Sequence, residues 1–73
     1  MATKKLTVTL TYQGLNYEFD DDVELAKPCH DSGYDEKRRT RDFSWPGLTQ
    51  AGADALVKKL KALKGPRRRI VVG

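Results

Sequence analysis

Apolar and polar residues alternate at the start of the chain, which is typical of a β-strand with one buried face. The residues on its apolar side are Leu6, Val8, Leu10 and Tyr12. The dipeptide Gln13-Gly14 can form a tight turn. After this turn the alternation resumes at Leu15, Tyr17 and Phe19. Residues 5–20 are therefore predicted to form a β-hairpin.

A second pattern, with apolar residues at helical spacing, lies between residues 49 and 64. The residues that gather on one side of such a helix are Ala53, Leu56, Val57, Leu60 and Leu63. Thr49 is suited to cap the first turn, and Gly65-Pro66 is a strong stop signal. The sequence predicts an amphipathic helix over residues 49–64.

The remaining segments contain few apolar residues. Residues 27–40 are rich in charges and turn formers, which predicts a long exposed loop of a composition typical of disordered segments. The stretch RTRDFSW alternates again and is compatible with a short strand. The β-branched run that ends the chain predicts a strand over residues 69–72. The fold class is thus α+β: residues 1–73 form one domain, an antiparallel sheet of three to four strands packed against one helix.

Length and composition narrow the class of protein. A chain of 73 residues has room for a single small core. Because Cys29 is the only cysteine, no disulfide forms within the chain, which argues against a stapled secreted domain. There is no apolar run that could cross a bilayer, and the polar start lacks the apolar region of a signal peptide. We expect a cytoplasmic protein that does not bind membranes.

The net charge of +4 is unevenly distributed along the chain. Residues 1–26 carry two lysines against five carboxylates, a net charge of −3, and residues 27–45 carry +1. Residues 46–73 carry seven basic residues against one acidic residue, a net charge of +6. Such a division of charge influences the choice of partner rather than the fold.

Cys29, His30 and Asp31 form the one cluster that suggests chemistry. A structural zinc site needs four ligands, and no second Cys/His pair completes this one. Adjacent residues of an extended loop point apart, so a Cys–His nucleophile pair is also not expected. The acidic run at residues 20–24 lacks the spacing of a calcium loop. We therefore expect no metal, no cofactor and no enzymatic activity.

Three groups of residues are candidates for binding a partner. Each has a purely structural alternative, because charge runs are often solvated surfaces and basic residues favour helix C-termini. Acidic residues can contact a basic surface, whereas basic residues interleaved with aromatic ones occur at protein interfaces and at sites that stack on bases. For Trp45 we favour the core. The candidates are Asp20, Asp21 and Asp22; Tyr34, Lys37, Arg38, Arg39 and Arg41; and Lys58, Lys61, Arg67, Arg68 and Arg69.

Taken whole, from MATKKLTVTLTYQGLNYEFDDD to KGPRRRIVVG, the sequence resembles the small RNA-polymerase-binding transcription regulators of lytic Xanthomonas phages. The resemblance covers the full chain and rests on size and general sequence character. It implies a non-enzymatic protein that binds the host bacterial polymerase, inhibits transcription initiation and promotes antitermination. No residue-level role is carried over from it.

Two functions therefore remain open. The first is a monomeric phage protein that redirects host RNA polymerase by protein–protein contacts in the host bacterial cytoplasm. The alternative is a small nucleic-acid-binding protein, in which the basic residues between Lys58 and Arg69 neutralise phosphates and an aromatic residue stacks on bases.

Overall fold

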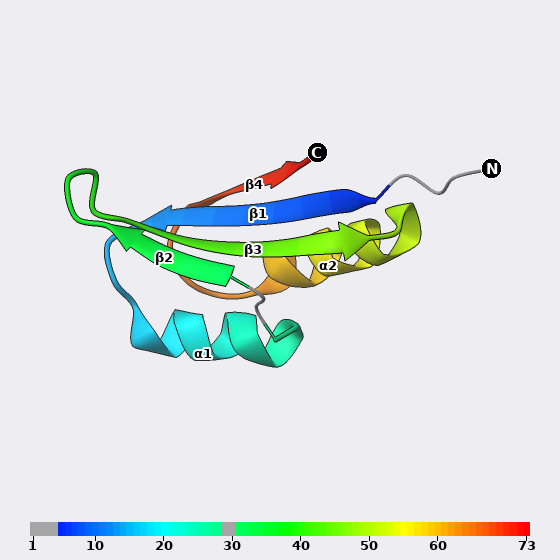
Figure 1. Ribbon diagram of the computed structural model, residues 1–73. Coiled ribbons are helices and arrows are strands. Elements are labelled where there is room, and N and C mark those ends of the chain that lie inside the picture. The colour runs from blue at the N-terminus through cyan, green and yellow to red at the C-terminus, as the bar shows by residue number, and fades with distance from the viewer. Residues whose placement is uncertain (1–4, 29–30) are drawn as a thin grey trace.

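Six elements follow one another along the described residues, 5–28 and 31–73, of the computed structural model (Figure 1). Four are strands and two are helices. In chain order they are β1 (Leu6–Gln13), α1 (Tyr17–Ala26), β2 (Asp31–Asp35), β3 (Thr40–Leu48), α2 (Gln50–Ala62) and β4 (Arg68–Val72).

The four strands form one open antiparallel sheet in the order β2-β3-β1-β4. β1 is an inner strand, so Tyr12 lies opposite Arg41 of β3 on one side and opposite Arg68 of β4 on the other. Both helices cover the same face of this sheet, as Figure 1 shows. The predicted α+β class with an antiparallel sheet of three to four strands is confirmed. The prediction of a single helix was wrong, because two helices pack against the sheet.

The core lies between the sheet and the two helices. The alternation predicted for β1 is observed: its apolar side is buried, and its three threonines lie on the opposite, open face of the sheet. Trp45 is 1% exposed, which confirms its expected place in the core. The buried apolar residues are Val8, Leu10, Tyr12, Phe43 and Trp45 from the sheet and Phe19, Val23, Ala53, Leu56 and Leu60 from the helices.

The prediction of a hairpin over residues 5–20 was wrong in its second half, because β1 pairs with β3 and β4 and residues 17–26 form α1. The side chain of Asn16 caps this helix by accepting a hydrogen bond from the Phe19 amide at 3.0 Å. Phe19 and Val23, four residues apart, then face the core. Aspartates that weaken a strand are favourable near a helix N-terminus.

The predicted loop over residues 27–40 was also partly wrong, because it contains β2. This strand has almost no apolar side chain. It is held by backbone pairing with β3, in which Gly33 lies opposite Asp42. Arg39 adopts a positive φ of 54° in the turn that joins the two strands. Cys29 and His30 of the predicted loop lie outside the described residues.

The C-terminal half of the chain follows the sequence prediction closely. α2 spans Gln50–Ala62, and the Thr49 hydroxyl caps it by accepting a hydrogen bond from the Gly52 amide at 3.1 Å. β4 begins one residue before the predicted strand and ends at Val72. Neither helix of the described chain has the length and apolar character needed to cross a membrane.

Candidate interaction surfaces

The outer side of α1 forms an acidic surface. Because Phe19 and Val23 face the core, most of the residues between and around them point away from the sheet. Two apolar residues lie among them, since Tyr17 is 74% and Leu25 is 84% exposed. We call this the α1 acidic surface; its charged members are Glu18, Asp21, Asp22 and Glu24. Of the predicted acidic contacts, Asp21 and Asp22 belong to it.

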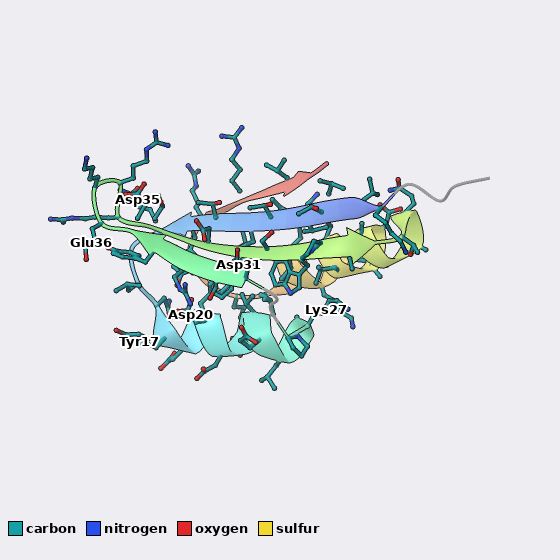
Figure 2. The ribbon with its side chains drawn as sticks, viewed as in Figure 1. Tyr17, Asp20, Lys27, Asp31, Asp35 and Glu36 are labelled. Atoms are coloured by element: carbon teal, nitrogen blue, oxygen red, sulfur yellow. The ribbon has the colours of Figure 1, made fainter. Side chains whose placement is uncertain are left out.

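Asp20 differs from its two neighbours because it points toward the sheet (Figure 2). Its carboxylate accepts a hydrogen bond from the Tyr12 hydroxyl and forms an ion pair with Arg41, in which Nε and Oδ2 are 3.4 Å apart. Arg41 also donates to the Gly33 carbonyl at 3.0 Å, and its guanidinium lies over the Phe43 ring. The side chains of Arg41 and Asp20 are only 20% and 15% exposed, so each largely neutralises the other.

Tyr12 completes this internal network. Burial, reinforced by the hydrogen bond to Asp20, raises the pKa of the Tyr12 phenol to about 12. The phenol therefore keeps its proton into the alkaline range, and it serves as the donor to Asp20. The network links α1, β1, β2 and β3 at one end of the sheet. Two predicted contact residues, Asp20 and Arg41, thus hold the fold together at this point.

The opposite charge gathers on α2 and at the start of β4. All of its members are exposed, because the buried side of α2 is occupied by Ala53, Leu56 and Leu60. An open hollow of about 370 Å³ lies here, lined by Lys61, Gly65, Pro66, Arg67, Arg68 and Ile70. We call this the α2–β4 basic surface; its charged members are Lys58, Lys59, Lys61, Lys64, Arg67 and Arg69.

Arg68, although predicted as a contact, is directed inward. Its guanidinium lies 4.6 Å from the centre of the Phe19 ring and donates to the carbonyls of Leu60, at 2.6 Å, and Pro66, at 3.1 Å. These contacts join β4 to both helices. The role of Arg68 visible in the structure is therefore to position α1 and the end of α2.

A third group surrounds the turn between β2 and β3. Asp35 orders the turn by accepting hydrogen bonds from the amides of Lys37, at 3.0 Å, and Arg38, at 3.3 Å. Figure 2 shows Asp35 and Glu36 at the end of the molecule that this turn forms, where they offset part of the basic charge. We call this the turn cluster; its exposed members are Tyr34, Asp35, Glu36, Lys37, Arg38 and Arg39.

The sheet brings two basic groups that are far apart in sequence to one end of the molecule. Gln13 lies opposite Thr40, which follows the turn cluster, and Tyr12 lies opposite Arg68 at the start of β4. The turn cluster and Arg67 therefore flank the same end of β1. No local sequence pattern predicts this arrangement, because it depends on the strand order.

Exposed apolar residues were missed by the sequence prediction. Val71 and Val72 of β4 are 48% and 42% exposed, and Tyr17 and Leu25 border the α1 acidic surface. The available signal for Tyr17 and Leu25 was the spacing of Phe19 and Val23. A helix that buries Phe19 and Val23 turns Tyr17 and Leu25 outward. Within the described part of the chain, no three His, Cys, Asp or Glu side chains are grouped so that they could hold a metal ion.

Comparison with known proteins gives no match: no protein family, no curated protein and no solved structure is similar to this chain at a significant level.

Proposed function

We propose that the chain is a phage-encoded protein that binds host bacterial RNA polymerase, inhibits transcription initiation and promotes antitermination without catalysing a reaction. The resemblance of the whole chain to polymerase-binding phage regulators supports the choice of partner. The observation that carries a binding role is the separation of charge: the α1 acidic surface and the α2–β4 basic surface lie on neighbouring helices and are both exposed.

The size of the molecule indicates how it would act. With principal extents of 41 × 25 × 17 Å, it offers roughly one interface of standard size, about 800 Å² per partner. Two surfaces of opposite charge can engage two polymerase elements at once and fix the orientation of the complex. The protein would then act in the host cytoplasm by bracing or blocking moving parts of the enzyme.

A second function, binding to nucleic acid, is favoured by one observation. The basic residues of the turn cluster and Arg67 flank the same end of the sheet, where Tyr34 is 39% exposed. Cations beside an exposed aromatic ring are suited to contact phosphates and to stack on an unpaired base. Asp35 and Glu36 oppose such binding, which is the physical reason for ranking it second.

Charge reversal on each surface distinguishes the two functions. We would measure the affinity of the chain for purified core polymerase, and for labelled DNA and RNA, over a range of salt concentrations. One double variant reverses the acidic surface (Asp21→Lys with Asp22→Lys) and the other reverses the basic surface (Lys58→Glu with Lys61→Glu). Lys5→Glu, an exposed position outside both surfaces, serves as the control.

If the chain binds polymerase through both surfaces, each double variant weakens that binding about tenfold or more. Promoter-dependent initiation and read-through of a terminator then return to their levels without the protein. If the chain binds nucleic acid, reversal of the acidic surface strengthens binding and the salt dependence is steep. Absence of polymerase binding by the folded wild-type chain would refute the proposed function.

A further inference from the structure

Among the described residues, no strand pairs with the outer side of β4. β4 lies at the edge of the sheet, next to β1. Thr7 and Gly73 exchange both of their backbone hydrogen bonds, at 2.8 and 3.0 Å. Because such pairs alternate along an antiparallel ladder, Val71 also bonds to β1, whereas the N–H and C=O groups of Ile70 and Val72 point outward. These outward groups can accept another strand.

The side chains of this edge do little to prevent pairing. Natural sheets protect their edges with charged residues, prolines or bulges. β4 begins with Arg68 and Arg69, of which Arg68 is directed inward, but the segment from Ile70 to Val72 has none of these devices. Val71 and Val72 are instead 48% and 42% exposed. An exposed aliphatic edge of this kind is a template for an extended segment of another chain.

The surroundings indicate the chemistry of that segment. Arg67 and Arg69 are exposed at the start of β4, and Lys61 and Lys64 lie close by on the α2–β4 basic surface. The hollow of about 370 Å³ borders Ile70 on the helix side of the edge, so a side chain of an added strand can enter it. Acidic side chains would therefore be stabilised beside the arginines, and aliphatic ones beside Ile70.

We propose that the outer edge of β4 binds an extended segment of a partner protein as a fifth strand. Its aliphatic residues lie beside Ile70 and Val72, and its acidic residues lie beside Arg67 and Arg69. The inference deepens the proposed function and rests on it in one respect, because it takes the partner to be a protein. A second copy of this chain fits poorly, since its β4 edge carries three arginines and no carboxylate, so it would supply no acidic side chains to the arginines of the first copy.

Amide hydrogen exchange on the full chain tests the pairing directly. The probe is a synthetic peptide of roughly ten residues, alternating valine and threonine and ending in three glutamates. In the free chain we expect fast exchange at Ile70 and Val72 and slow exchange at Val71. Saturating peptide should slow exchange at Ile70 and Val72 and leave Val71 unchanged. This alternation is specific to strand addition, because binding by charge alone does not protect every second amide.

Two variants and one control support this measurement. Val72→Pro removes an outward donor without removing a bond to β1, and we expect it to weaken peptide binding about tenfold or more. Arg69→Glu should weaken binding through charge alone and keeps the backbone intact. The control is Ser32→Pro on the other edge strand, β2, where the same substitution should leave peptide binding unchanged. Amide spectra of each variant show whether it is folded.

The same three variants are then tested against core polymerase, so that the two proposals fail separately. If polymerase binds wild type and Val72→Pro equally and the peptide protects no alternate amides, the edge inference is overturned and the proposed function stands. If the peptide pairs with β4 but polymerase does not bind, the edge inference stands and the proposed function is refuted. Protection of Ile70 that grows with the concentration of the chain alone would show self-pairing and overturn the inference.

Discussion

The two helices lie on the same face of the sheet and are held there by different means. α2 buries Ala53, Leu56 and Leu60 along one side, and two lysines in its last turn are favourable at its C-terminus. α1 buries only Phe19 and Val23, and its last turn has no basic residue. α2 thus buries three apolar side chains along its length, whereas α1 buries two, of which Phe19 is the larger.

α1 depends in addition on directional contacts from other elements. The Trp45 indole donates to the Lys27 carbonyl at 3.2 Å, just beyond the end of the helix. Near its start, Asp20 bonds to Tyr12 and Arg41. Gly65 passes so close to Phe19 that an added Cβ would lie 2.5 Å from the ring. α1 is therefore positioned by a few specific groups, and it should open more easily than α2.

The largest change in stability should come from truncating a buried side chain, and the loss should differ between the two helices. Leu60→Ala should cost about 2–5 kcal/mol, because it removes a fully buried side chain and leaves a cavity. Since a domain of this size has roughly 3–5 kcal/mol of net stability, this variant should be largely unfolded. Val23→Ala removes less volume and should cost about 1–2.5 kcal/mol. Urea unfolding monitored by Trp45 fluorescence measures both, and equal losses would contradict the comparison.

A smaller effect tests the polar anchor of α1. Asp20→Asn removes the charge that pairs with Arg41, and we expect a loss of about 1–2 kcal/mol. Asp21→Asn is the matched control: the residue is exposed, and its change should stay within about 0.5 kcal/mol. Amide exchange should show faster opening of α1 in the first variant while α2 is unaffected. Similar behaviour of the two variants would mean that the ion pair does not hold the helix.

The smallest effect concerns Tyr12, whose titration changes the stability of the fold only at alkaline pH. The pKa of Tyr12 is raised to about 12 in the folded chain, so between about pH 10 and 12 the unfolded chain loses a proton that the folded chain keeps. Stability should therefore fall as the pH rises through this window, and below it Tyr12 contributes no pH dependence. Tyr12→Phe should remove this part of the decline. Ultraviolet titration of tyrosinate checks it, and an unchanged titration curve in the variant would refute the assignment.

The local sequence was sufficient to predict the elements whose pattern of apolar residues matches their burial in the fold. β1 alternates because one face is buried, and α2 has both an apolar side and clear start and stop signals. α1 was missed because Leu15, Tyr17 and Phe19 continue the alternation of β1 across Gly14. The competing signals were the cap at Asn16 and the spacing of Phe19 and Val23, which a short helix shows only weakly.

The remaining differences arise from tertiary structure. β2 has no strand-forming side-chain pattern, and it exists because the turn places its backbone beside β3. The candidate contacts divide for the same reason: Asp21 and Asp22 are exposed as expected, whereas Asp20 is drawn to Arg41, twenty-one residues further along the chain. No local pattern distinguishes three adjacent aspartates. Their roles are decided by which side of α1 faces the sheet.

Arg68 connects the outer strand to the helix that depends most on its neighbours. Its backbone belongs to β4, while its guanidinium lies over Phe19 of α1 and bonds to the end of α2. A ligand that restrains β4 should therefore also restrain α1, and by thermodynamic reciprocity a partner on α1 should favour binding at β4 to the same degree. The two surfaces of opposite charge would then act cooperatively, with one arginine side chain as the physical link between them.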